Sequence, residues 1–106
     1  MNCTWPLGNG KTLEFFIFDP ATTTWKALAG LYIFAGKTGP TDWTAYYVGQ
    51  TEDLGSRLQN HEQWPSAVRH GATHVHTLVV PQEASRLLYE QLLIQNLQPV
   101  LNQMLK

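Results

Sequence analysis

The chain has 106 residues, of which 43% are hydrophobic and 14% are charged, a composition that predicts one globular domain rather than a disordered segment. Its seven Lys and Arg are balanced by eight Asp and Glu, so it lacks the basic excess of proteins that hold nucleic acid tightly through phosphate contacts. The single cysteine, Cys3, excludes an internal disulfide. We see no signal-peptide pattern and no apolar stretch near the ~18 residues of a membrane helix, so we expect a soluble, cytoplasmic protein without a membrane partner.

Strand-like segments dominate the first half of the chain. Residues 11–20 (KTLEFFIFDP) are rich in aromatic and β-branched side chains and end at a turn signal, so they predict a strand. Residues 30–35 (GLYIFA) and 44–50 (TAYYVGQ) predict two more strands, which the polar loop between them should pair antiparallel. Residues 21–28 are ambiguous and leave open a short helical turn around Trp25.

Helical signals follow. Residues 51–62 predict a helix with Thr51 as its N-cap, and Trp64-Pro65 ends it and opens a short helix that reaches about His70. Residues 73–80 (THVHTLVV) predict a fourth strand.

Residues 82–96 predict the strongest helix of the chain, and Pro99 separates it from a short terminal helix or turn. The order of elements predicts an α+β fold, with a small, mainly antiparallel sheet flanked by helices as in an α/β sandwich.

The first predicted strand raises the question of what covers it. Alternation places Leu13, Phe15 and Ile17 on one face, and Phe16 and Phe18 on the other. At least one of these faces must be covered. We expect the chain's own helices to cover it, and a homodimer is the alternative.

Glu90 is the most informative residue of the strongest helix. At about 100° per residue it falls between Ile94 and Leu97, inside an apolar arc. A carboxylate on a buried stripe is costly unless it is paired or holds a cation. One interpretation is a structural Glu that bonds to an Arg or reaches solvent, and the other is a metal ligand or general base.

Other polar candidates are weaker when each is taken singly. Arg57 and His61 stand at i and i+4, so on a helix they would share one face. Strand alternation should send Tyr46 and Tyr47 to opposite faces of the sheet. A zinc site built from His70, His74 and His76 has only weak support from their spacing.

Six positions in chain order together carry a stronger signal. They are the segments GLY (30–32) and YVG (47–49) followed by Arg57, His61, Glu90 and Asn102. This order and spacing resembles the GIY-YIG endonuclease superfamily, with this chain as a small single-domain member. The resemblance spans about residues 29–102. It implies a nuclease domain over residues 29–106, and residues 1–28 would form an N-terminal extension with an aromatic strand.

The resemblance implies a divalent-metal-dependent endonuclease that hydrolyses phosphodiester bonds in nucleic acid, with DNA favoured over RNA. Glu90 would be the sole protein ligand of one Mg²⁺ or Mn²⁺, because such cations take oxygen ligands and keep several waters. Arg57 would donate to the phosphate, and Tyr32 would be the base for the attacking water. Tyr47 would orient water or phosphate, and His61 would be a proton relay or alternative base.

Further residues would contact the substrate. Asn102 would hold a phosphate oxygen or brace the helix of Glu90, and Gly49 would let the backbone approach the substrate. His70 and Lys37 would also bind nucleic acid. Because the chain carries little positive charge, a homodimer, a partner protein or a single-stranded substrate would have to supply affinity and specificity.

Two other functions remain open at this point. A catalytically inactive nucleic-acid-binding or protein-binding module could keep the same fold, although it would have no need of Glu90 on an apolar stripe. A zinc-dependent hydrolase built on the three histidines is the other.

Overall fold

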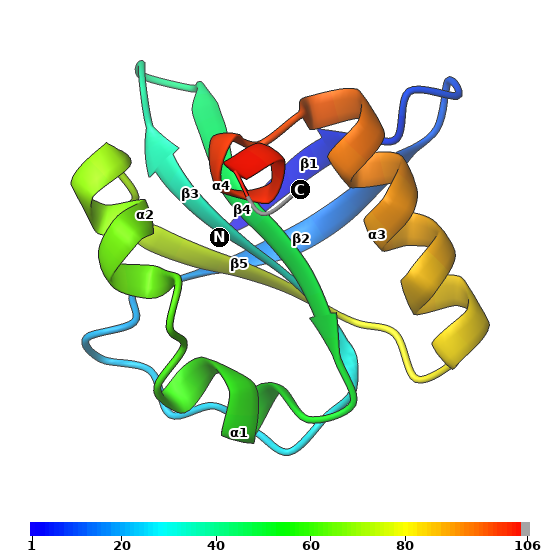
Figure 1. Cartoon of the computed structure of the whole chain (residues 1–106), viewed down its shortest axis with the longest axis horizontal. Helices are drawn as coiled ribbons and strands as arrows, with labels where there is room; N and C mark the ends of the chain where they lie inside the picture. The colour runs from blue at the N-terminus through cyan, green and yellow to red at the C-terminus, as the bar shows by residue number, and fades with distance from the viewer. Residues whose placement is uncertain (105–106) are drawn as a thin grey trace.

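The fold is built on one curled sheet of five strands (Figure 1). The structure is a computed structural model, and it describes residues 1–104. The strand order is β1-β2-β5-β3-β4, and every neighbouring pair is antiparallel. The strands are β1 (Asn2–Pro6), β2 (Thr12–Phe18), β3 (Gly30–Lys37), β4 (Trp43–Thr51) and β5 (His74–Val79). The helices are α1 (Leu54–Gln59), α2 (Trp64–His70), α3 (Glu83–Leu97) and α4 (Val100–Met104). The predicted α+β fold with a mainly antiparallel sheet is confirmed.

Each face of the sheet has its own hydrophobic core. Helix α3 covers one face, where Leu93 packs with Leu31 and Ile33 of β3. Helices α1, α2 and α4 cover the other face, which presents the alternate residues of β3, Tyr32 and Phe34. Figure 1 shows α3 on one side of the strands and α1 and α2 on the other. Because β3 is an internal strand that is buried on both faces, its alternation fixes which side chains can enter a site beside α1.

The N-terminal residues belong to the same sheet. The predicted strand over residues 11–20 is present as β2, which pairs with β5 on one side and with β1 on the other. Strand β1 was not predicted, because a five-residue edge strand that ends at a proline gives almost no periodic signal. Trp5 of β1 is nonetheless buried.

The faces of β2 are covered unequally. Phe15 is fully buried in the core beneath α3, so the chain covers that face itself. Phe16, on the opposite face, is 51% exposed. Dimerisation through this strand stays a prediction. None of the helices in the described residues is long and apolar enough to cross a membrane.

Helix α1 is shorter than predicted. Its N-cap is Asp53, whose carboxylate accepts a hydrogen bond from the backbone N–H of Ser56 at 3.1 Å, while Thr51 still belongs to β4. The helix ends at Gln59, so His61 lies in the following turn and does not share a helix face with Arg57, and that prediction was wrong. Asp53, two residues after Thr51, caps the helix with its side chain and so begins it later than the sequence predicts.

The segment that joins β2 to β3 contains no helix. Asp19 organises it instead, since its carboxylate accepts from the backbone N–H of Ala21 at 2.9 Å and its carbonyl accepts from the Thr23 hydroxyl at 2.6 Å. The helical turn left open around Trp25 is therefore replaced by a loop that begins with a side-chain-stabilised turn.

Candidate active site

Tyr32 lies at the centre of a polar cluster on the face covered by α1 and α2. It is only 1% exposed, and its strand partner is Gly49 of β4. A Cβ atom at position 49 would overlap the phenol ring and hydroxyl of Tyr32. Gly49 is thus required to make room for the Tyr32 side chain, which is a different reason from the predicted approach of the backbone to substrate.

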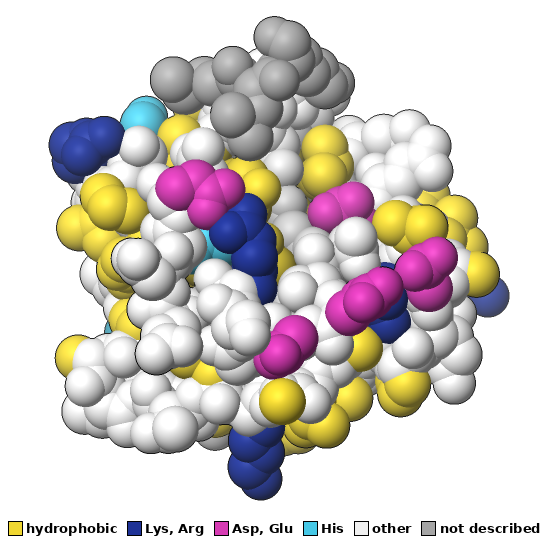
Figure 2. All heavy atoms as spheres, turned by 60° about the horizontal axis from the view of Figure 1, so that its bottom comes forward, with side chains coloured by type: hydrophobic (Ala, Val, Ile, Leu, Met, Phe, Trp, Pro, Cys, Tyr) yellow, Lys and Arg dark blue, Asp and Glu magenta, His cyan; other side chains and the backbone are white. Residues whose placement is uncertain are grey.

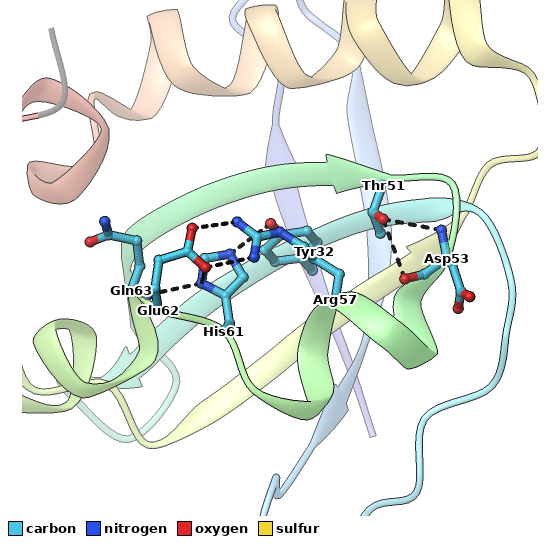
Figure 3. A network of polar contacts seen from close by, with 7 residues as sticks. All are labelled: Tyr32, Thr51, Asp53, Arg57, His61, Glu62 and Gln63. Carbon is cyan, nitrogen blue, oxygen red and sulfur yellow. Dashed lines mark hydrogen bonds and ion pairs between the residues drawn. The ribbon is translucent and has the colours of Figure 1, made fainter.

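His61 holds the Tyr32 hydroxyl (Figure 3). The His61 Nε2 and Tyr32 Oη atoms are 2.9 Å apart, and the backbone N–H of Gln63 donates to His61 Nδ1 at 3.0 Å. Because Nδ1 accepts a hydrogen bond, the neutral ring carries its proton on Nε2 and donates it to Tyr32 Oη. Burial, assisted by the nearby Arg57 charge, lowers the pKa of His61 to about 4. His61 is therefore a neutral hydrogen-bond donor near pH 7, which favours a role in supporting Tyr32 over the predicted roles of proton relay or alternative base.

The surroundings of the two neighbouring phenols, Tyr32 and Tyr47, oppose their ionisation. Burial raises the pKa of Tyr32 above its ordinary value, and the neighbouring Tyr47 adds to this effect. Burial likewise raises the pKa of Tyr47. The positive charge of Arg57 acts in the opposite direction on both groups. Added positive charge in this cluster would therefore be needed to make Tyr32 a base near neutral pH.

Arg57 points toward the same cluster but is engaged by Glu62. The two groups form a bidentate ion pair, with Nη1 to Oε2 at 2.6 Å and Nη2 to Oε1 at 2.8 Å. Figure 3 shows the pair beside the Tyr32–His61 contact. The Arg57 guanidinium lowers the pKa of Glu62 to about 2, so both members of the pair are charged near neutral pH. Glu62 was not predicted as part of the site.

A β-bulge sets the positions of Tyr46 and Tyr47. Phe34 pairs with Tyr47 and Ala35 pairs with Ala45, which leaves Tyr46 as the extra residue. Both tyrosines consequently pack on the face of Tyr32, and the predicted placement on opposite faces was wrong.

The two tyrosines nevertheless occupy different places on this face. The Tyr47 ring centroid lies 6.2 Å from that of Tyr32 and 5.2 Å from that of His61. Tyr46 packs instead near Gly71, with its ring 6.4 Å from His70. Tyr47 is therefore the tyrosine that can act together with Tyr32.

Glu90 reaches this region from α3, around the edge strand β4. It is half-buried, and burial raises its pKa while the backbone N–H of Gln50 opposes that shift. Its negative charge contributes to the raised pKa of both Tyr32 and Tyr47. The carboxylate therefore acts on the same cluster as Arg57.

The structural interpretation of Glu90 as the partner of an Arg does not hold. Within residues 1–104 no cationic side chain forms an ion pair with Glu90. Arg86, one turn earlier, donates to the Gln50 side chain at 3.1 Å and to the carbonyls of Val80 and Pro81 at 3.2 and 2.9 Å. A half-buried carboxylate without a cationic partner fits a divalent cation that takes one protein oxygen and several waters.

Asn102 binds the backbone of β4. Its Oδ1 accepts from the Val48 N–H at 2.8 Å, and its Nδ2 donates to the Val48 carbonyl at 2.9 Å. The amide thus forms the hydrogen bonds that a neighbouring strand would form with the free edge of β4, next to Gly49. This contact favours a bracing role, although what it braces is β4 rather than the helix of Glu90.

Lys37 and His70 lie outside the cluster. Lys37 is at the far end of β3, five positions and about 16 Å along the strand from Tyr32. His70 ends α2, and its Nδ1 is 2.9 Å from the Ser66 carbonyl. The structure does not bring either residue to Tyr32.

The histidines 70, 74 and 76 do not build a zinc site. His76 is fully buried, with its Nδ1 accepting from Trp5 Nε1 at 3.0 Å, and His74 Nδ1 is 2.8 Å from the Thr73 hydroxyl. Among residues 1–104 no three His, Cys, Asp or Glu side chains converge as metal ligands.

Comparison with known proteins places this geometry in context. A scan of family models and a search of curated proteins found no match. Solved structures do match, among them the GIY-YIG N-terminal endonuclease domain of UvrC from Thermotoga maritima bound to its catalytic divalent cation, magnesium. That match has 26% identity, covers 71% of this chain and 83% of the other, and has a TM-score of 0.57.

Point mutants of the same UvrC domain match as well. A tyrosine-to-phenylalanine mutant bound to its catalytic divalent cation matches at 26% identity, covering 71% of this chain and 82% of the other with a TM-score of 0.57. An asparagine-to-alanine mutant matches to the same extent. This similarity supports a nuclease function. The chain therefore has the fold of the GIY-YIG endonuclease domain, as the order of its motifs predicts.

Proposed function

We propose that this protein is a divalent-metal-dependent endonuclease that hydrolyses phosphodiester bonds in nucleic acid, with DNA favoured over RNA. The observation that carries the proposal is the buried Tyr32 hydroxyl, 2.9 Å from His61 Nε2, in a fold similar to a GIY-YIG endonuclease domain bound to its catalytic divalent cation. Tyr32, Arg57 and Glu90 come to this cluster from β3, α1 and α3. Phosphodiester cleavage needs a base, a donor to the charged phosphate and a metal ligand, and these three groups supply them.

Each group has a defined task in this proposal. A Mg²⁺ or Mn²⁺ held by Glu90 would supply positive charge at the scissile phosphate and at the departing 3′-oxygen. Arg57 donates to the non-bridging phosphate oxygens, where negative charge builds. Tyr32, as its phenolate, takes a proton from the attacking water while His61 Nε2–H steadies the Oη atom. Tyr47 closes the site beside Tyr32.

A direct test is to incubate the protein with single- and double-stranded DNA and RNA in Mg²⁺, in Mn²⁺ or in EDTA, and to size the products. We expect internal cleavage in the presence of either cation and none in EDTA. Cleavage that persists in EDTA would contradict a metal-dependent nuclease. Binding of nucleic acid with no cleavage under any condition would favour the inactive binding module.

The ion pair between Arg57 and Glu62 leads to a prediction about binding. Glu62 accepts a hydrogen bond from each terminal nitrogen of Arg57, so it competes with a phosphate for the same bidentate edge of the guanidinium. We expect Glu62→Gln to bind single-stranded oligonucleotides several-fold more tightly than wild type in EDTA, as measured by fluorescence anisotropy. Glu83→Gln is the control, because it removes the same charge from the exposed first turn of α3. Equal affinity of the two variants would show that Glu62 does not compete with phosphate.

A further inference from the structure

A pocket of about 530 Å³ opens beside the candidate active site. It lies between the loop that joins β2 to β3 and the segment that carries α1 and the start of α2. Three aromatic side chains line it, those of Trp25, Phe34 and Trp64, and Trp25 comes from the loop. Phe34 and Trp64 meet edge to face, with ring centroids 5.1 Å apart, so this wall is packed and held in place.

The pocket is uncharged and has hydrogen-bonding groups. Among the described residues that line it, none is Asp, Glu, Lys or Arg, and His61 is neutral near pH 7. The side-chain amides of Gln59 and Asn60 are exposed and form no hydrogen bond within residues 1–104, so they can donate and accept. Aromatic walls with free amides suit a flat, neutral ligand that has donors and acceptors along its edge.

The position of the pocket identifies that ligand. His61 belongs to both places, since its Nε2 holds Tyr32 in the active site and the residue also lines the pocket. Leu58, which follows Arg57 directly, is another lining residue. A group in the pocket would therefore lie next to the segment that carries Arg57 and His61, and the neutral, flat part of a nucleotide whose phosphate binds at Arg57 is its base.

Charge gives a second, independent argument. The chain has a net charge of −1, and the part of the face in Figure 2 that is not drawn in grey shows no continuous basic patch. Phosphate contacts alone would therefore give little affinity. Stacking of a base on an aromatic side chain gives affinity without positive charge.

We propose that this pocket is a subsite for an unpaired nucleobase next to the scissile phosphate, so that the substrate is single-stranded or locally unpaired. The proposal rests on the nuclease function proposed above. In a duplex every base is paired and stacked, and it would have to leave the helix before it could enter the pocket. The Trp25 loop therefore selects against intact duplex.

The test measures binding in EDTA, where no cleavage occurs, by fluorescence anisotropy of labelled oligonucleotides. We expect Trp25→Ala to weaken binding of single-stranded DNA about tenfold. Trp25→Phe keeps an aromatic face and should restore most of the affinity. Phe16→Ala is the control, because Phe16 is an exposed aromatic residue that does not line this pocket, and it should bind like wild type. Thermal melting followed by circular dichroism establishes that each variant is folded.

An abasic site sharpens the assignment. When the abasic site is moved along the oligonucleotide, it should weaken binding to the wild-type protein at one position only. At that position the abasic site should not weaken binding to Trp25→Ala, which already lacks the stacking side chain. Equal affinity of Trp25→Ala and wild type, or equal affinity of wild type for duplex and single strand, would overturn the subsite. Failure of the nuclease proposal would be seen separately, as an absence of cleavage in Mg²⁺ while this binding pattern persists.

Discussion

Replacing Glu90 by glutamine is expected to lower Mg²⁺-dependent cleavage by about 10³-fold or more while the fold is retained. Glutamine keeps the shape of the side chain but removes the charge that would hold the cation. A catalytic metal contributes several kcal/mol to transition-state stabilisation, and each ~1.4 kcal/mol is about tenfold in rate. Because the half-buried carboxylate has no cationic partner within residues 1–104, the melting temperature should stay the same or rise.

Two measurements on two variants make this prediction specific. Single-turnover cleavage and thermal melting are compared for Glu90→Gln and Glu83→Gln, the latter in the exposed first turn of the same helix. Glu83→Gln should cleave at close to the wild-type rate. A Glu90→Gln protein with wild-type activity, or one that loses melting temperature without a selective loss of metal-dependent cleavage, would contradict a metal-binding role.

Tyr32→Phe should give the second largest effect, a loss of about 10²- to 10⁴-fold in the rate of cleavage, which is the usual contribution of a general base. The variant keeps the ring that packs over Gly49 but removes the Oη atom held by His61. It also leaves the His61 N–H without its partner, so we expect a stability loss of about 1–3 kcal/mol.

The pH dependence separates a base from a structural tyrosine. Burial raises the pKa of Tyr32 above its ordinary value, so little phenolate forms near neutral pH and its fraction keeps growing as the pH rises. The wild-type rate should therefore rise through neutral and alkaline pH. Tyr32→Phe should lose this rise, whereas Tyr46→Phe, altered at the bulge beside His70, should keep both the rate and its pH profile. A pH profile that is unchanged in Tyr32→Phe would exclude Tyr32 as the base.

Local patterns were sufficient to predict the central elements. The antiparallel pairing of β3 with β4 followed from two aromatic strand segments and the polar loop between them. Helix α3 begins and ends within one residue of the predicted range, because Pro81 and Pro99 bound it. The order of the motifs predicted Tyr32, Tyr47 and Glu90 as site residues, and these regular elements fix the positions of all three.

Contacts between elements could not be predicted from the periodicity of the sequence. Tyr46 reaches the same face as Tyr47 because of a bulge, and an extra residue in one strand shifts the register without a signature in a single sequence. The pair formed by Arg57 and Glu62 depends on where α1 ends. A helix that continued to residue 62 would hold these side chains about 140° apart, but the turn after Gln59 brings them together.

The most direct test of the account is to locate the cation. Crystals of the protein with Mn²⁺ and a non-cleavable oligonucleotide would show the metal through its anomalous scattering. We predict one peak in contact with the Glu90 carboxylate, beside the cluster of Tyr32 and Arg57, and its loss in Glu90→Gln crystals. A Mn²⁺ peak elsewhere on the protein, with Glu90 free of metal beside a bound phosphate, would contradict the account.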